Sequence, residues 1–227
     1  MPTNEAERLE ALRDYHILDT EAEQAYDDIS TLAAYICDVP IALISLVDES
    51  RQWFKSKVGL DRKETSREIA FCAHAILQSE PMIVRDATKD PRFAASELVR
   101  RAPNVRFYAG FPLTSHEGHN IGTLCAIDRK PRKLSVVQKQ AMQALSRQVM
   151  ALLELRRVSA HLADALEHVK ALQGLLPICA WCKRIRDDKG YWSQVEAYIQ
   201  SHSDASFTHG ICPECLEKQR PKKRSPK

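Results

Sequence analysis

The sequence predicts an α+β protein in which an antiparallel sheet flanked by helices is followed by a long helix and a small cysteine-containing module. Three observations predict this. Apolar residues in the first 130 positions switch between helical and strand spacing, no proline lies between Pro131 and Pro177, and four cysteines near the C-terminus form two CxxC pairs. We expect an α+β domain over residues 1–150, a coiled-coil helix over 151–175, a cysteine module over 176–217 and a basic disordered tail over 218–227.

Two helices are expected at the start of the chain, because apolar residues recur at helical spacing over residues 5–18 and 21–37. A third is expected after Thr65, which with Glu68 three residues later forms a capping-box pattern, and it should extend to about Gln78. These helices would flank the sheet.

The strands are predicted from short apolar or alternating runs bounded by polar turns. The runs are Ile41–Val47, the alternating stretch through Trp53, Lys55 and Lys57, Met82–Val84, Arg106–Leu113 and Ile121–Ile127. The first two form one hairpin across the polar residues 48–50, and the last two form another across residues 115–120.

A long helix is expected to begin at Ser135, where Ser135 and Gln138 form a second capping box, and to run for about 40 residues. Its apolar residues repeat with spacings of three and four over three heptads, which predicts a parallel homodimeric coiled coil. The seam consists of Leu155, Val158, Leu162, Ala165, Val169, Leu172 and Leu176.

Composition and motifs exclude several classes of protein. The chain has 227 residues with 33 Lys and Arg against 30 Asp and Glu, and six of the basic residues lie in the tail. It has seven scattered glycines and contains neither phosphate-binding glycine motifs nor HExxH or GxSxG, so we expect no enzyme of these types and a non-enzymatic role. Without a long apolar run or an apolar N-terminus, we expect a cytoplasmic protein with no membrane partner.

Several segments together resemble one bacterial branch of the GAF family: ILDT at 17–20, PIALISLVDESRQWFKS at 40–56, ETSREIAFCAHAI at 64–76, RFYAGFPL at 106–113 and GTLCAID at 122–128. The resemblance implies a PAS-like, six-stranded antiparallel sheet flanked by helices. It also implies a sensor module that binds a small molecule and dimerises through the helix that leaves the domain. The resemblance names no ligand.

The resemblance places a ligand between the sheet and the helix that follows Thr65. Phe107 and Tyr108 point to opposite faces of a strand, so one of them at most faces that space. We expect Tyr108 and Arg106 to contact the ligand, with Cys72 contributing from the helix.

The four C-terminal cysteines, Cys179, Cys182, Cys212 and Cys215, predict a structural zinc site, because two CxxC pairs supply a complete tetrahedral set of thiolates. A metal would also stabilise a module of about 40 residues with few apolar groups. The segment resembles a short cysteine module found at the ends of bacterial PAS, GAF and receiver-domain proteins. An iron site, a redox dithiol and free thiols are the alternatives.

The leading hypothesis for function is a signalling protein in which ligand occupancy changes a dimeric helix and the zinc module presents the result to a downstream protein. One alternative is a thiol redox sensor or GAF-type sulfoxide reductase that uses Cys72, Cys125 or the CxxC pairs. Another is a nucleic-acid-binding regulator that uses the zinc module and the basic tail, but nucleic acid is not the partner we expect.

Overall fold

A computed structural model describes residues 4–170, 176–187, 189–203 and 205–219. The chain divides into two compact units, residues 1–160 and 161–227. We describe each by itself.

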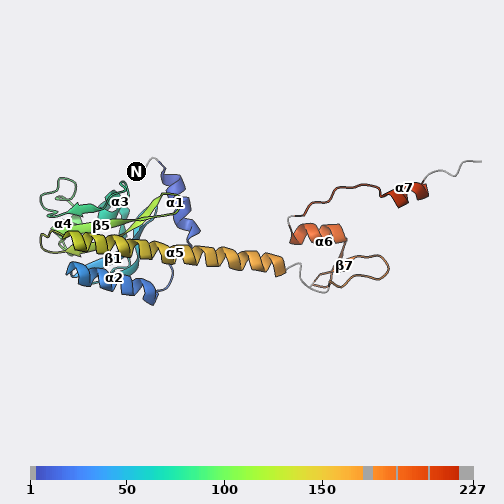
Figure 1. The fold of residues 1–227 in the computed structure, drawn as a ribbon, viewed down its shortest axis with the longest axis horizontal. Helices are drawn as coiled ribbons and strands as arrows, with labels where there is room; N and C mark the ends of the chain where they lie inside the picture. The colour runs from blue at the N-terminus through green and yellow to red at the C-terminus, as the bar shows by residue number, and fades with distance from the viewer. Residues whose placement is uncertain (1–3, 171–175, 188, 204, 220–227) are drawn as a thin grey trace, which may run out of the picture. The chain divides into compact units, whose positions relative to one another are not determined.

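The first unit is built on a six-stranded antiparallel sheet with the order β3-β2-β1-β6-β5-β4 (Figure 1). Its strands are β1 (Ile41–Val47), β2 (Arg51–Val58), β3 (Glu64–Ser66), β4 (Met82–Val84), β5 (Phe107–Thr114) and β6 (Asn120–Asp128). Both predicted hairpins and the short strand at residues 82–84 are confirmed. Strand β3 was not predicted.

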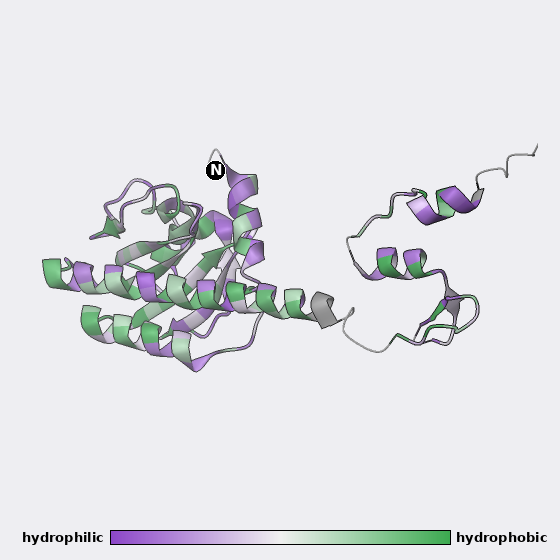
Figure 2. Ribbon diagram, turned by 45° about the vertical axis from the view of Figure 1, so that its right-hand side comes forward, coloured by the Kyte–Doolittle hydropathy of each residue, from purple (hydrophilic) through white to green (hydrophobic). Residues whose placement is uncertain are grey.

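Three helices cover one face of this sheet: α1 (Glu5–Asp14), α2 (Gln24–Cys37) and the first part of α5 (Val136–Lys170). Helices α2 and α5 lie side by side in Figures 1 and 2. The apolar core beneath them contains buried residues of these three helices and of β1, β2, β5 and β6. It includes Leu12, Ile17, Tyr26, Ala33, Ile44, Phe107, Phe111, Leu124, Met142 and Val149.

A β-bulge shifts the register of β1 and β2 between Ile44 and Ser45, so that Lys55 has no partner opposite it on β1. As a result Lys55 and Ser56 both point toward the α2 side. The buried ammonium of Lys55 donates to Glu23 Oε1 at 2.6 Å and to Thr20 Oγ1 at 2.8 Å. The bulge thus joins the middle of β2 to the segment that leads into α2.

The opposite face is covered by short elements: a 3-10 turn η1 (Arg67–Ile69), α3 (Phe71–Ala75) and α4 (Glu97–Arg100). The capping box predicted at Thr65 is wrong, because Thr65 lies in β3 and pairs with Gln52. Ser66 caps the turn instead, and its hydroxyl accepts the N–H of Glu68. The predicted long helix is therefore a strand, a turn and a helix of five residues.

Helix α5 begins as predicted. Ser135 Oγ accepts the N–H of Gln138 at 3.2 Å, and Gln138 Oε1 accepts the N–H of Ser135 at 2.9 Å. The described part of the helix extends from Val136 to Lys170, and Leu176 lies in non-helical chain. Leu172 and the side chain of Val169 lie outside the described residues.

In the second half of α5, four large apolar residues among those described are exposed between 51% and 64%: Leu155, Val158, Leu162 and Leu166. The first three belong to the predicted seam. Leu166 was not part of the predicted seam, which contained its neighbour Ala165 instead.

The second unit contains a hairpin, β7 (Ile185–Arg186) with β8 (Trp192–Ser193), and two helices, α6 (Val195–His202) and α7 (Pro213–Gln219). Asp187 Oδ1 accepts the N–H groups of Lys189 and Tyr191 in the hairpin turn. Most of the predicted basic tail, residues 220–227, lies outside the described residues. Across the described chain, no helix combines the length and the apolar character needed to cross a membrane.

Candidate functional site

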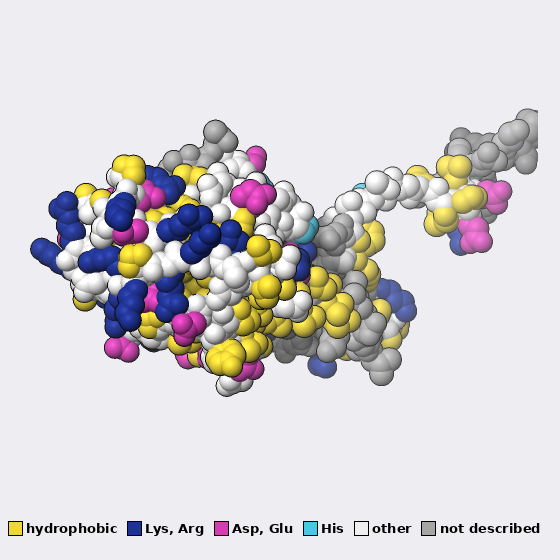
Figure 3. Space-filling model, turned by 60° about the vertical axis from the view of Figure 1, so that its left-hand side comes forward, with side chains coloured by type: hydrophobic (Ala, Val, Ile, Leu, Met, Phe, Trp, Pro, Cys, Tyr) yellow, Lys and Arg dark blue, Asp and Glu magenta, His cyan; other side chains and the backbone are white. Residues whose placement is uncertain are grey.

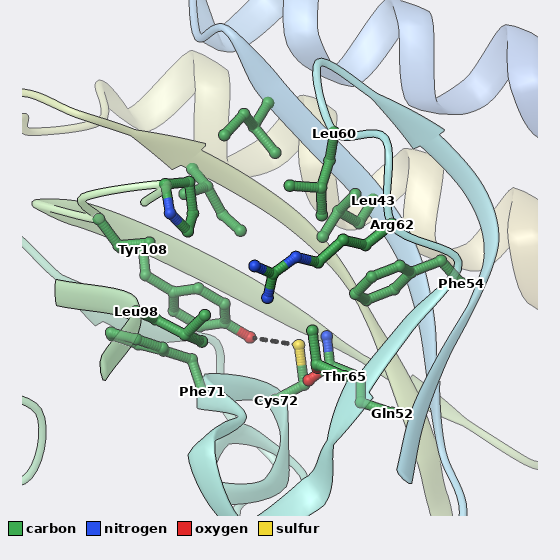
Figure 4. Close-up of a pocket in the computed structure, with 14 residues that line it drawn as sticks. Leu43, Gln52, Phe54, Leu60, Arg62, Thr65, Phe71, Cys72, Leu98 and Tyr108 are labelled. Carbon is green, nitrogen blue, oxygen red and sulfur yellow. Dashed lines mark hydrogen bonds between the residues drawn. The ribbon is translucent and has the colours of Figure 1, made fainter. Parts of the chain in front are cut away.

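A small cavity of about 40 Å³ lies between the sheet and the short elements on its α3 side (Figure 4). Strands β1, β2, β5 and β6 form its floor, while β3, α3, α4 and the segments before β3 and after α4 form its walls. The lining residues are Ile41, Leu43, Gln52, Phe54, Leu60, Arg62, Thr65, Phe71, Cys72, Leu98, Pro103, Val105, Tyr108 and Ile127.

Tyr108 lies fully buried in this lining, and Phe107 beside it on β5 packs in the core of the opposite face. The prediction that the two side chains point to opposite faces is confirmed. The Tyr108 ring lies across Gly110, where an added Cβ would come within 2.2 Å of the tyrosine oxygen. Gly110 therefore leaves the space in which the Tyr108 hydroxyl reaches α3.

The Tyr108 hydroxyl donates to Cys72 Sγ at 3.2 Å, and this hydrogen bond joins β5 to α3 (Figure 4). Cys125 on β6 lies next to the same sulfur, and its own thiol donates to the carbonyl of Leu43 at 3.6 Å. Two thiols from distant parts of the sequence thus meet in one buried cluster.

The two thiols of this cluster differ in acidity. Burial by itself raises the pKa of Cys72, but the polar groups around its sulfur, Cys125 and the Tyr108 hydroxyl among them, more than offset burial and lower it to about 6. The interaction with Cys72, followed by burial, raises the pKa of Cys125. Burial also raises the pKa of Tyr108. Cys72 is therefore the more acidic thiol of the pair.

Unsatisfied polar groups gather on this face of the sheet. In the described part of the chain, the buried side-chain oxygens without a hydrogen-bond partner of good geometry are Ser45 Oγ, Gln52 Oε1, Thr65 Oγ1 and Thr123 Oγ1. They form two cross-strand pairs, Ser45 with Thr123 and Gln52 with Thr65. Gln52 and Thr65 line the cavity, whereas Ser45 and Thr123 lie close to Cys72. Buried polar groups normally find partners, so this concentration indicates a site with room for further hydrogen bonds.

Of the three residues predicted to contact a ligand, Tyr108 and Cys72 line the cavity and Arg106 does not. Arg106 precedes β5 and donates to the carbonyls of Val99 and Val105 at 2.8 and 3.1 Å. The arginine at the cavity is Arg62, whose guanidinium points into the space between Tyr108 and Phe54 (Figure 4). Sequence reasoning missed Arg62, because it lies in a polar connecting segment without periodicity.

The four C-terminal cysteines do not form the predicted metal site in the structure. Among the described residues, no three His, Cys, Asp or Glu side chains lie close enough together to hold a metal ion. Within the first pair, Cys179 Sγ accepts the N–H of Cys182 at 3.5 Å. Backbone N–H groups also lower the pKa of Cys179 and of Cys212, in each case chiefly through the cysteine three residues later.

A model of the GAF domain matches residues 21–153, which is more than half of the chain and covers all six strands of the sheet. The chain belongs to the GAF family. The resemblance of its sequence segments is thereby confirmed, and the cavity described above lies within the GAF domain.

A cyclic di-GMP phosphodiesterase from Pseudomonas aeruginosa is 42% identical to this chain over 151 residues. The match covers 66% of this chain and 26% of that protein, so the chain spans about a quarter of the relative's length. The two proteins are homologous over the GAF domain.

Solved structures show the same fold. The GAF domain of a phosphoenolpyruvate-protein phosphotransferase from Coxiella burnetii matches with a TM-score of 0.52 and 14% identity, over 70% of this chain and 99% of that one. The PixJ GAF domain of Thermosynechococcus elongatus, in its blue-light absorbing form, matches with a TM-score of 0.51 and 13% identity, over 70% and 97%. At these identities the likeness is one of fold alone.

Proposed function

We propose that this GAF domain is a small-molecule sensor whose ligand occupies the cavity between the sheet and α3. The observation that carries the proposal is the lining itself, in which Gln52 and Thr65 present unpartnered polar atoms amid apolar walls. A pocket of apolar surface with a few convergent polar groups is typical of ligand sites. We propose a non-enzymatic role for the domain.

The sensor proposal is tested by screening the full chain against a library of small metabolites while following the methyl NMR signals of Leu43 and Ile127. A ligand of the cavity shifts both signals in a saturable way. Leu43→Phe, which fills part of the cavity, should abolish the shift of the Ile127 signal, and Val137→Phe, at an exposed position of α5, should not. If no compound shifts the signals, or if Leu43→Phe leaves binding intact, the proposal fails.

We propose that occupancy passes to a downstream signalling protein through α5 paired with a second copy of the chain. Support comes from the exposed apolar residues Leu155, Val158, Leu162 and Leu166, which recur with helical spacing. Val158→Glu with Leu162→Glu should convert a dimer to a monomer in light scattering at micromolar concentration. Val137→Glu on the same helix is the matched control. A double variant with the wild-type mass would contradict the proposal.

A thiol redox sensor is the second candidate, favoured by the meeting of Cys72 and Cys125. In it, the Cys72 thiolate attacks an oxygen of a peroxide, the O–O bond breaks and the alcohol or water leaves. The Cys125 thiol then attacks the sulfenic sulfur, so that a disulfide forms and water is released. The peroxide is reduced by two electrons and the two thiols are oxidised.

Mass spectrometry after peroxide treatment tests this second candidate. It predicts a loss of two mass units and a peptide that links Cys72 to Cys125, while Cys125→Ser should trap the sulfenic acid. Cys37, buried in the opposite core with its pKa raised to about 11, is the internal control and should remain reduced. An unreactive Cys72 would exclude the candidate.

For the C-terminal module we propose a zinc ion bound by Cys179, Cys182, Cys212 and Cys215. Support comes from the sequence, in which two CxxC pairs supply four cysteines for a tetrahedral site. Metal analysis of the purified full chain should give one zinc per chain, and Cys212→Ser should lower it. Zinc-free protein with four titratable thiols would exclude the site.

A further inference from the structure

Arg62 is the charged residue of the cavity. The lining contains no Asp or Glu, and the Arg62 guanidinium points into the space above Cys72 and Thr65 (Figure 4). Arg62 is exposed at the cavity, and within the described residues its guanidinium has no carboxylate or carbonyl partner. Arg51 on strand β2 differs from Arg62, because its guanidinium pairs with Asp19 at 2.6 Å and with Glu64 at 2.8 Å.

Gln52 and Thr65 complete a set of polar groups around Arg62. The Gln52 side chain is buried, with 5% of the residue exposed, and its Oε1 has no partner. Its amide nitrogen and oxygen exchange places by rotation about the last side-chain bond, so the group can donate to a ligand. The Thr65 hydroxyl opposite it on β3 is also unpartnered and can donate as well.

The remaining lining is apolar and limits the size of the ligand. A volume of about 40 Å³, against roughly 10–15 Å³ for one water-sized group, accommodates about three or four heavy atoms. Leu43, Phe54 and Ile127 suit a short hydrocarbon part. The polar groups Arg62, Gln52 and Thr65 suit an anion that accepts several hydrogen bonds.

We propose that the cavity binds a short aliphatic carboxylate, with Arg62 pairing with its charge and with Gln52 and Thr65 donating to its oxygens. This inference rests on the proposed sensor function and names its ligand class. A carboxylate matches the fork of N–H groups on a guanidinium, and hydrogen bonds between charged groups are the strong ones. A neutral amide of the same shape lacks the charge and presents a single acceptor oxygen.

Titrations of the full chain with formate and acetate, the carboxylates small enough for the cavity, each against its neutral amide, test the inference. The readouts are calorimetry and the methyl signals of Leu43 and Ile127, at constant ionic strength with chloride as the balancing anion. We expect the carboxylate to bind about tenfold or more tightly than the amide. Arg62→Gln should lower carboxylate affinity by a similar factor and leave amide affinity unchanged. Arg129→Gln, at an exposed arginine outside the lining, is the matched control.

The outcomes separate this inference from the sensor proposal. Carboxylate binding that Arg62→Gln weakens and Arg129→Gln does not would support both. Equal binding of carboxylate and amide, or carboxylate binding unaffected by Arg62→Gln, would overturn the anion assignment and leave the cavity as a ligand site. If neither series binds while another library compound shifts the methyl signals, the carboxylate assignment alone fails. If nothing binds, both fail.

Discussion

Strand β2 presents buried polar side chains to both faces of the sheet, and the two faces differ in whether these side chains find hydrogen-bond partners. Lys55, on the side of α1, α2 and α5, donates to Glu23, to Thr20 and to the carbonyl of Glu21. Gln52, three residues earlier, faces α3 with an acceptor that has no partner. Leaving a buried polar group unpaired costs about 1–3 kcal/mol. Gln52 on the α3 face therefore lowers the stability of the fold, whereas the paired Lys55 on the helical face does not incur this cost.

The difference indicates that the helical face stabilises the fold and that the α3 face contains the site. The helical face has a continuous apolar core that includes residues of all three of its helices. The α3 face is covered by short elements and contains the cavity, the thiol cluster and, among the described residues, the buried side-chain oxygens without partners. Polar groups that have no partner within the protein lower its stability but remain available to bind a ligand.

The largest effect is expected from Glu23→Ala on the helical face. The variant leaves the fully buried Lys55 ammonium without a carboxylate, and we expect a loss of about 3 kcal/mol in the free energy of unfolding. Gln52→Leu is the counterpart on the α3 face, where no hydrogen bond is lost, and should be neutral or stabilising. Urea denaturation measures both. Equal destabilisation by the two variants would contradict the comparison.

Glu5 joins the two faces at the end of the sheet, because its carboxylate accepts from Arg8 on α1 at 2.7 Å and from Arg67 on η1 at 2.6 Å. Burial raises the pKa of Glu5, but the two arginines outweigh burial and lower it to about 2. The stability that ionised Glu5 contributes to the folded state is therefore complete above about pH 4.5 and is lost as the pH falls toward 2.

Glu5→Gln should accordingly lower the free energy of unfolding by about 2–3 kcal/mol at pH 7 and reduce its decline between pH 5 and 3. Thermal unfolding at a series of pH values measures this. Glu10→Gln, at an exposed position of the same helix, is the control. An unchanged pH profile in Glu5→Gln would contradict the assigned role.

A smaller effect is expected from Gly110→Ala. The added methyl group would come within 2.2 Å of the Tyr108 oxygen, so the ring must move, and we expect about 1–3 kcal/mol of destabilisation. The hydrogen bond to Cys72 should be lost, which would raise the pKa of Cys72 and slow its alkylation at neutral pH. Alkylation rates that match the wild type would show that Tyr108 does not control this thiol.

The smallest effect on stability is expected from Arg62→Gln, which should change the free energy of unfolding by less than about 0.5 kcal/mol. The reason is that the guanidinium has no partner to lose among the described residues. Arg67→Gln, which breaks the pair with Glu5, is the comparison and should be clearly destabilising. A large loss in Arg62→Gln would mean that this arginine serves the fold.

The sequence determined the features that depend on local pattern. Alternating and apolar runs identified both hairpins, and the reciprocal capping of Ser135 and Gln138 identified the start of α5, because these signals act over a few neighbouring residues. Period two alone assigned Phe107 and Tyr108 to opposite faces. The family segments predicted the six-stranded sheet.

The tertiary structure decided what depends on contacts between distant segments. Thr65 carries a capping signal, but pairing with Gln52 places it in a strand, because the hydrogen bonds of a sheet edge outweighed a local cap. Cys72 and Cys125 meet, and Arg62 replaces Arg106 at the cavity, since each site residue comes from a different element. No spacing along the chain encodes such a meeting, because it depends on how strands and connecting segments pack in three dimensions.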